Sequence, residues 1–206
     1  MVDSIIFDLD GTLWDPTETV VGGWNHVIKG YLGAAHEITI ENLQGIMGLP
    51  VPEVGRKLFP DTDEDTRQKI MDECCDMECL VLSQQGGRLY ARVEEVLQAL
   101  SAKYKLFIVS NCQTGYIEAF YEYHGLQKYF TDYENPGRTG LSKGENIRLV
   151  MDRNHLMSAV YVGDTEGDRK AAGFAGIPFV YAGYGFGEVG SYDYVIDRLD
   201  GILDLF

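Results

Sequence analysis

The sequence predicts an α/β protein in which a block of helices interrupts a parallel sheet after its first strand. Two observations carry most of this prediction. From residue 92 onward, apolar runs of strand length alternate with stretches whose apolar residues recur at helical spacing. Such alternation is typical of right-handed crossovers in a parallel sheet. Residues 13–85 show helical patterns alone, so we expect several helices and no strand there.

The size and charge of the chain limit what it can bind. Its 206 residues, 45% of them hydrophobic, suffice for one large domain or for one domain with a sizeable insertion. The formal net charge is -15, with 32 acidic residues against 17 basic ones. Such a charge disfavours nonspecific nucleic-acid binding and docking on anionic lipid. An anionic substrate would therefore need local positive charge, from basic side chains or from a metal ion.

The cysteines and the N-terminal residues indicate a cytoplasmic protein with free thiols. No Cys-x-x-Cys pair is present, which disfavours a zinc site. Asp3 interrupts the start of the chain, so we expect no signal peptide. No run approaches the ~20 apolar residues of a membrane span, so we expect no membrane partner. We expect small, inert packing residues at the four cysteines, which are Cys74, Cys75, Cys79 and Cys112.

The first predicted strand, Ile5–Phe7, leads into Asp8-Leu9-Asp10-Gly11-Thr12. Because side chains alternate along a strand, Asp8 and Asp10 leave the backbone on roughly the same side, where Gly11 lets the chain turn. Two carboxylates this close stay ionised together only beside a positive charge. A divalent cation is the obvious candidate. Taken alone, the pattern fits a solvated turn equally well.

The helical block and the later elements follow in order. We expect helices from Val20 to Tyr31, after Thr39, after Pro52, and from about residue 61 to Ser83, with Gly86-Gly87 as a hinge. Beyond residue 92, the predicted strands are 105–110, 129–133, 159–163, 177–181 and 194–196. The predicted helices there are 93–100, 115–123, 143–153, 165–173 and 199–205.

Polar residues follow several of these strands. Ser110-Asn111 ends the strand from residue 105, and Gly163-Asp164 ends the strand from residue 159, with Asp168 four residues later. The carboxyl ends of parallel strands lie at one edge of the sheet, where such proteins bind ligands. Several acids around one point require a cation, and oxygen ligands alone favour a magnesium-like ion. We therefore expect a metal site formed by Asp8, Asp10, Asp164 and Asp168.

The same edge of the sheet holds donors for a phosphate group. Ser110 supplies a hydroxyl, and Lys143, which opens a predicted helix, supplies a point charge. Backbone amides around residues 9–11 can also point at an anion. Each of these residues has an ordinary alternative. Ser110 suits a turn, Lys143 a solvated surface position and Asp168 the first turn of a helix.

Together, these segments resemble the four motifs of the haloacid dehalogenase superfamily, and they occur in the same order. Within that superfamily, the chain resembles the subfamily similar to phosphoglycolate phosphatases. Asp8-Leu9-Asp10-Gly11-Thr12 resembles the first motif, and Ser110-Asn111 the second. Lys143 resembles the third, and Gly163-Asp164-Thr165-Glu166-Gly167-Asp168 the fourth. The resemblance covers about residues 4–206, and its first and fourth motifs are the specific ones. One departure is Gly144, where many relatives carry proline.

The resemblance implies a fold and an activity. The fold is a Rossmannoid core, residues 1–13 and 86–206, with a small all-helical cap of the C1 type, residues 14–85. The activity is that of a magnesium-dependent phosphatase acting on a small phosphorylated metabolite, in a monomer or weak homodimer. Asp8 would be the nucleophile that forms an aspartyl phosphate, and Asp10 the general acid and base. Asp8, Asp164 and the carbonyl of Asp10 would hold Mg²⁺.

The remaining roles also follow from the resemblance. Asp168 would hold a metal-bound water or orient its neighbours. Ser110, Asn111 and Lys143 would bind the phosphate. Asp10 argues against dehalogenases, whose halide leaves unprotonated, and against phosphonatases, which lack an aspartate at this position.

Other readings stay open. They are a β-phosphoglucomutase-like phosphomutase, an inorganic pyrophosphatase and, as a non-enzyme, a phospho-receiver module. A receiver would be shorter and would have no helical insertion. Cap side chains that could contact a substrate are Asn25, His26, Arg56 and Lys57, although a surface role is simpler for each. The loop 183–187 follows a core strand and is expected near the site.

Overall fold

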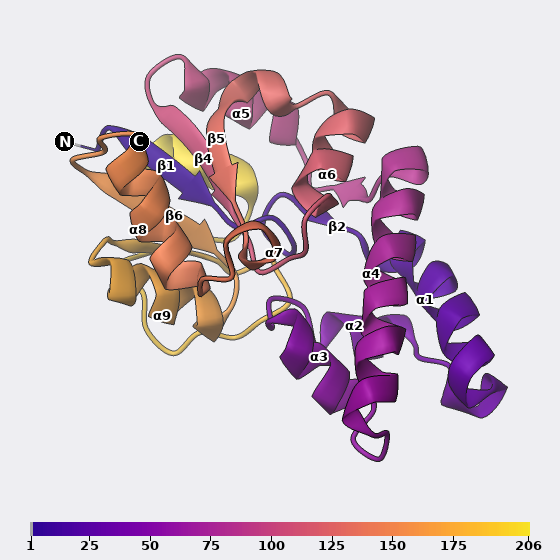
Figure 1. The fold of residues 1–206 in the computed structure, drawn as a ribbon. Coiled ribbons are helices and arrows are strands. Elements are labelled where there is room, and N and C mark those ends of the chain that lie inside the picture. The colour runs from indigo at the N-terminus through magenta and orange to yellow at the C-terminus, as the bar shows by residue number, and fades with distance from the viewer. Residues whose placement is uncertain (1) are drawn as a thin grey trace.

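The computed structural model describes residues 2–206 and confirms the α/β class. Six parallel strands form one sheet in the order β5-β4-β1-β6-β7-β8 (Figure 1). Sheet neighbours such as β1 and β4 are joined by long crossovers, as a parallel sheet requires. The strands are β1 (Ser4–Phe7), β4 (Lys105–Val109), β5 (Phe130–Glu134), β6 (Ala159–Gly163), β7 (Phe179–Ala182) and β8 (Tyr194–Ile196).

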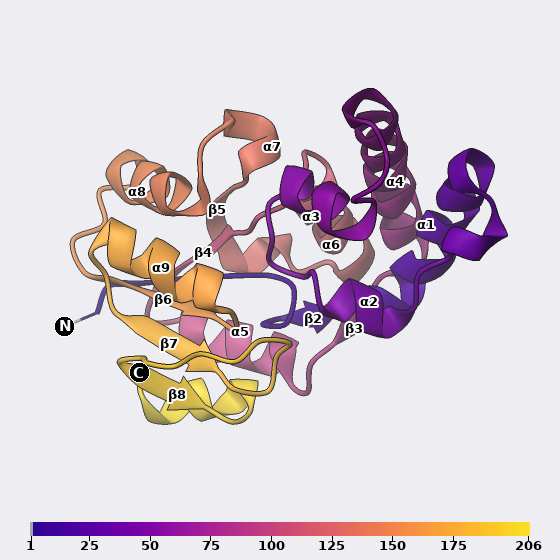
Figure 2. The same cartoon turned by 90° about the horizontal axis from the view of Figure 1, so that it is seen from below.

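Strand β1 is buried throughout and lies between β4 and β6. Its alternating side chains enter two different cores, one on each face of the sheet. Ile5 and Phe7 pack with α5 (Val93–Ser101) and α6 (Tyr116–His124), whereas Ile6 packs with α8 (Lys143–Arg153) and α9 (Glu166–Ala175). Figure 2 shows α8 and α9 on one side of the sheet and α5 on the other. Every residue of β1 from Ile5 to Phe7 therefore contributes apolar burial, which explains its continuous apolar run.

The helical insertion, here meaning residues 17–85, lies beside the sheet (Figure 1). Its longest helix, α4, packs along α1 and also contacts α6. Thr39 caps the short helix α2 through a capping box, and Asp63 caps α4 by accepting a hydrogen bond from the amide of Thr66. The four α-helices of the insertion are α1 (Thr17–Leu32), α2 (Ile40–Gln44), α3 (Val51–Leu58) and α4 (Glu64–Gln85).

The expectation of no strand in residues 13–85 was wrong. Strand β2 (Trp14–Asp15) pairs antiparallel with β3 (Arg88–Leu89), where the chain enters and leaves the helical insertion. Asp15 accepts a hydrogen bond from Arg88 at 3.0 Å and another from Thr17 Oγ1 at 2.6 Å. Strands of two residues show no periodicity, so sequence patterning cannot detect them.

Most other boundaries lie within two residues of those predicted. The helix Lys143–Arg153 and the strands Ala159–Gly163 and Tyr194–Ile196 have the predicted bounds. The last predicted helix is a 3₁₀ helix, η3 (Leu199–Asp204). Three short elements were not expected, namely η1 (Ala34–His36), η2 (Gln127–Tyr129) and α7 (Pro136–Thr139). Within residues 2–206, no helix has both the length and the apolar character needed to span a membrane.

Candidate active site

Three buried aspartates meet at the carboxyl edge of the sheet. One oxygen from each of Asp8, Asp164 and Asp168 lies within 4.8 Å of the other two. Asp8 follows β1 and Asp164 follows the adjacent strand β6, so the parallel register places the two side by side. Asp168 comes from the first turn of α9. The sheet topology therefore brings these three carboxylates together, as expected for residues that follow neighbouring parallel strands.

Both oxygens of Asp168 already have partners. Oδ2 accepts hydrogen bonds from the Asp164 amide at 3.2 Å, the Thr165 amide at 2.9 Å and the Thr165 hydroxyl at 2.7 Å. Oδ1 accepts a hydrogen bond from Lys143 Nζ at 2.6 Å. Thr165 and Asp168 also form the capping box of α9. Asp168 therefore holds its neighbours in position, and its oxygens are less available than those of Asp8 and Asp164.

Lys143 is the basic side chain at this edge. It is 5% exposed, and its Nζ lies 3.0 Å from Oδ1 of Asp8. Burial alone would lower the pKa of Lys143, but the charges of Asp168 and Asp8 raise it above its ordinary value. The position follows from Ser142, which caps α8 and starts the helix at Lys143. The ammonium group is thus held beside Asp8.

At the aspartate cluster, Oδ2 of Asp8 and Oδ1 of Asp164 are buried with no hydrogen-bond partner within residues 2–206, and Oδ1 of Asp8 has only its ion pair with Lys143. Burial and the nearby charge of Asp168 raise the pKa of Asp8 to about 7 and raise that of Asp164 well above its ordinary value. Unpaired buried carboxylates are costly unless a cation neutralises them. An all-oxygen set of this kind fits a magnesium-like ion.

Two glycines allow the backbone to approach Asp164 closely. Gly11 has φ +75°, and a Cβ atom there would lie 2.1 Å from Asp164 Oδ2. A Cβ atom on Gly185 would lie 2.3 Å from Asp164 Cβ. Next to Gly185, the amide of Phe186 donates to Asp164 Oδ2 at 2.7 Å. The loop 183–187 therefore lies at the site, as expected, and fixes one oxygen of Asp164.

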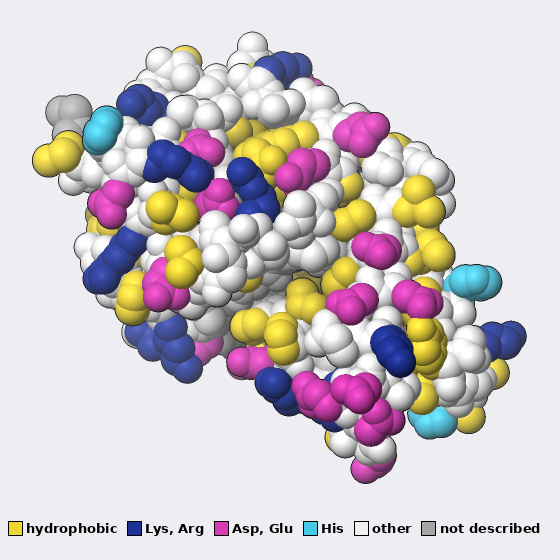
Figure 3. Space-filling model, in the orientation of Figure 1, with side chains coloured by type: hydrophobic (Ala, Val, Ile, Leu, Met, Phe, Trp, Pro, Cys, Tyr) yellow, Lys and Arg dark blue, Asp and Glu magenta, His cyan; other side chains and the backbone are white. Residues whose placement is uncertain are grey.

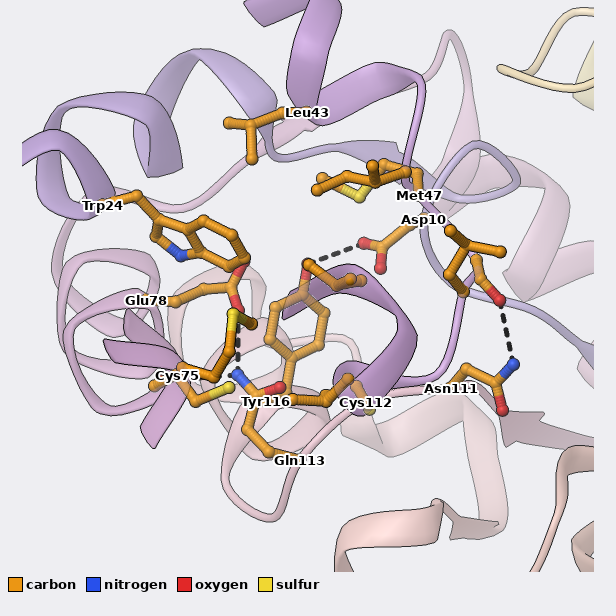
Figure 4. Close-up of a pocket in the computed structure, with 16 residues that line it drawn as sticks. Asp10, Trp24, Leu43, Met47, Cys75, Glu78, Asn111, Cys112, Gln113 and Tyr116 are labelled. Atoms are coloured by element: carbon orange, nitrogen blue, oxygen red, sulfur yellow. Dashed lines mark hydrogen bonds between the residues drawn. The ribbon is translucent and has the colours of Figure 1, made fainter. Parts of the chain in front are cut away.

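Asp10 is directed into different surroundings from Asp8. Its Oδ1 accepts hydrogen bonds from the indole of Trp14 and from the hydroxyl of Tyr116, both at 2.7 Å. Burial raises the pKa of Asp10 to about 6, while these two donors oppose the shift. Its side chain is not in the aspartate cluster, so a contribution to a metal would have to come from its backbone carbonyl. Asp10 lines a cavity between the helical insertion and the strand ends (Figure 4).

Ser110 and Asn111 follow β4 and differ in what they contact. Ser110 is 2% exposed, and its nearby hydroxyl lowers the pKa of Asp8. Asn111 instead donates from Nδ2 to the carbonyl of Gly48 at 2.9 Å (Figure 4). Gly48 lies between α2 and α3, and a Cβ atom there would be 3.1 Å from the side chain of Thr165. The helical insertion thus touches the strand ends at two points.

A cleft separates the helical insertion from the sheet, and Figure 3 shows it as a hollow. The cleft is lined by Lys143, among other residues. It shares Gly48, Asn111, Cys112 and Gln113 with the cavity beside Asp10. The cleft and the cavity therefore adjoin. Cys112 is buried, and burial raises the pKa of its thiol, as expected for an inert cysteine.

The cap side chains considered as substrate contacts lie elsewhere. None of Asn25, His26, Arg56 and Lys57 lines the cleft or the Asp10 cavity. Asn25 exchanges two hydrogen bonds with the backbone of Ile38, and Lys57 donates to the carbonyl of Gly45. Sequence reasoning missed Trp14, Tyr116 and Glu78. A tryptophan four residues after Asp10 was a weak signal, and the other two gave none.

Comparisons with known proteins agree with this geometry. The family model described as haloacid dehalogenase-like hydrolase matches residues 5–182. A phosphoglycolate phosphatase of Vibrio parahaemolyticus is 27% identical, over 98% of this chain and 94% of that protein. A Clostridium perfringens protein named putative pyrophosphatase PpaX is 25% identical, over 100% of this chain and 97% of that protein. The structure of a haloacid dehalogenase-like hydrolase from Streptococcus pneumoniae superposes with a TM-score of 0.87 at 21% sequence identity. The superposition covers 100% of this chain and 98% of that chain.

Proposed function

The chain belongs to the haloacid dehalogenase-like hydrolases, and we propose that it is a magnesium-dependent phosphatase that hydrolyses a small phosphomonoester through an aspartyl phosphate. One observation carries the proposal. Asp8 lies 3.0 Å from Lys143 in the aspartate cluster, whereas Asp10 faces the adjoining cavity. A nucleophile and a proton donor need such different surroundings, one beside the phosphate and one beside the leaving group.

In the first step, a carboxylate oxygen of Asp8 attacks phosphorus and the bond to the ester oxygen breaks. Asp10 gives its proton to that oxygen as the alcohol leaves. Lys143 and Ser110 donate to the phosphoryl oxygens, where charge is stabilised in the transition state. Trp14 and Tyr116 hold Asp10 in the required orientation through its Oδ1 atom.

In the second step, Asp10 takes a proton from a water molecule, whose oxygen attacks phosphorus. The bond between phosphorus and Asp8 breaks, which releases phosphate and restores both carboxyl groups. Asp8, Asp164 and the carbonyl of Asp10 would hold Mg²⁺, with Asp168 and Lys143 fixing their positions. When bound, the ion neutralises negative charge on the phosphoryl oxygens.

We further propose that residues 14–85 act as a cap over a core of residues 1–13 and 86–206. The paired strands β2 and β3 mark the two crossings between these parts. The Asn111–Gly48 hydrogen bond supports a closed arrangement in which the cap covers the cleft. A covered site would exclude bulk water while the alcohol leaves.

Phosphate release from a set of phosphomonoesters tests the proposal. The purified protein is assayed with Mg²⁺ and with excess EDTA, and Asp8→Asn serves as the control for contaminating phosphatases. We expect turnover that depends on Mg²⁺ and is absent in Asp8→Asn. Activity of the variant equal to that of the wild type would remove Asp8 from its role.

A further inference from the structure

The cavity beside Asp10 contains no basic group. Among the 16 residues that line it, all within the described chain, none is lysine, arginine or histidine. Most of its wall is apolar, formed by residues such as Leu43, Ile46, Met47, Val54 and Met71. Its volume of about 50 Å³ leaves room for a group of only a few heavy atoms. Any anionic group placed here would have no counter-charge.

The cavity does contain a second buried acid, Glu78 of α4, which is 6% exposed. Its Oε2 accepts a hydrogen bond from the side-chain amide of Gln113 at 2.9 Å. No hydrogen bond to Oε1 is found within residues 2–206. In the view of Figure 4, the Glu78 and Asp10 carboxylates lie on opposite sides of the Tyr116 ring. An acid in an apolar wall is unfavourable unless a ligand pairs with it.

Trp24 provides a second, independent indication that a polar ligand belongs here. The residue is 5% exposed and lines the cavity, yet its indole nitrogen has no hydrogen-bond partner in the described part of the chain. Buried donors are almost always satisfied, so each exception requires an explanation. Trp24 Nε1 only donates, so a group that accepts a hydrogen bond, such as a hydroxyl, would satisfy it.

The cavity adjoins the carboxyl group that serves the leaving alcohol. Under the proposed function, Asp10 protonates the ester oxygen, so the alcohol part of the substrate must enter this cavity. The adjoining cleft is lined by more acidic than basic side chains. Its lining carries Lys143 and Lys170 as its basic residues, against the acidic side chains of Glu53, Asp72, Asp76 and Glu166.

From these features we infer that the substrate is the phosphate ester of a small alcohol that bears no anionic group and carries a hydrogen-bond donor, a hydroxyl or an ammonium, toward Glu78. The inference rests on the proposed function and narrows it. A carboxylate, as in phosphoglycolate, or a second phosphate, as in pyrophosphate, would be desolvated in an apolar wall beside Glu78. An ionised group buried there without a counter-charge is strongly disfavoured.

Three esters that differ in one terminal group provide the test. They are 2-hydroxyethyl phosphate, phosphoethanolamine and 2-phosphoglycolate, with pyrophosphate as a fourth substrate. We expect kcat/KM for the better of the first two to exceed that for 2-phosphoglycolate and for pyrophosphate by about tenfold or more. The first two esters also distinguish a hydroxyl from an ammonium as the donor.

Glu78→Lys and a matched control, Glu122→Lys, assign the selectivity to the cavity. Glu78→Lys puts a positive charge in the cavity wall, so it should reduce the discrimination against 2-phosphoglycolate about tenfold. Glu122 is exposed on α6 and lines neither the cavity nor the cleft, so its variant should keep the wild-type ratio. Equal or better wild-type turnover of 2-phosphoglycolate or pyrophosphate would overturn the inference alone. No turnover of any phosphomonoester would overturn the proposed function as well.

Discussion

The Nζ atom of Lys143 lies 2.6 Å from Oδ1 of Asp168, and both side chains are buried. This ion pair joins the first turns of α8 and α9 below the strand ends. It also directs the ammonium group toward Asp8, at 3.0 Å. A buried pair of this kind is costly to break, because the remaining partner becomes an unpaired charge in the interior.

Replacing Lys143 with methionine should therefore damage both stability and activity. We expect a loss of roughly 3–5 kcal/mol in the free energy of unfolding, measured with urea, because Asp168 and Asp8 lose their counter-charge. Phosphatase activity should fall about 100-fold or more. The control Lys170→Met changes an exposed lysine of the same cleft, and it should alter stability by less than about 0.5 kcal/mol. Equal losses in the two variants would contradict this role for the buried pair.

Tyr116→Phe should lower activity with little change in stability. The substitution removes one of the two donors that hold Asp10 Oδ1, so the carboxyl group becomes less well oriented. We expect kcat to fall about tenfold. Tyr121→Phe is the matched control, because the Tyr121 hydroxyl is buried on the same helix without a partner in the described residues. An unchanged kcat in Tyr116→Phe would show that Trp14 alone positions Asp10.

Asn111→Ala should weaken substrate binding more than it slows chemistry. The variant loses the hydrogen bond to Gly48, which ties the helical insertion to the end of β4. We expect KM to rise several-fold and residues 45–50 to exchange amide hydrogens faster. Asn25→Ala, which breaks contacts to Ile38 away from the cleft, should leave KM unchanged. If residues 45–50 of the variant exchange amide hydrogens as slowly as those of the wild type, the Asn111–Gly48 hydrogen bond does not hold this segment in place.

Glu78→Gln should change how stability depends on pH. Burial raises the pKa of Glu78 to about 8, while the Gln113 amide opposes the shift and Asp10 adds to it. The neighbouring thiols of Cys75 and Cys79 stay protonated, because burial raises their pKa values. Between about pH 4.5 and 8, the folded state retains a proton that the unfolded state releases, so wild-type stability falls as pH rises.

The variant lacks this proton, so its stability relative to the wild type should increase with pH. The expected slope is at most about 1.4 kcal/mol per pH unit. Urea unfolding of both proteins at pH 5 and pH 8 measures it. Parallel stability curves would mean that Glu78 is ionised in the fold at both pH values.

The sequence predicted features that depend on local periodicity and on parallel topology. Residues after neighbouring strands must meet at one edge, so the meeting of Asp8 with Asp164 could be expected from the order of strands and helices alone. Pairings between residues far apart in the chain could not be predicted in this way. Asp15 and Arg88 pair across the whole helical insertion, and neither strand is long enough to show a pattern.

The surroundings of individual side chains also could not be predicted from the sequence. Glu78 stands in an acidic helix that is indistinguishable, by pattern, from a solvated one, yet it is buried beside Gln113. Asn111 was expected at the phosphate, and its side chain instead donates to Gly48, 63 positions away in the chain. These contacts depend on how the helical insertion packs on the strand ends, which local patterns do not encode.

The proposed mechanism requires that Asp8 becomes phosphorylated during turnover. Borohydride added during steady-state hydrolysis reduces an aspartyl phosphate to homoserine, and peptide mass spectrometry locates the change. We predict homoserine in place of Asp8 only when substrate and Mg²⁺ are both present, with Asp10 and Asp164 unmodified. An actively hydrolysing enzyme in which another carboxylate is reduced, or in which Asp8 stays intact while a control aspartyl phosphate is reduced, would contradict the account.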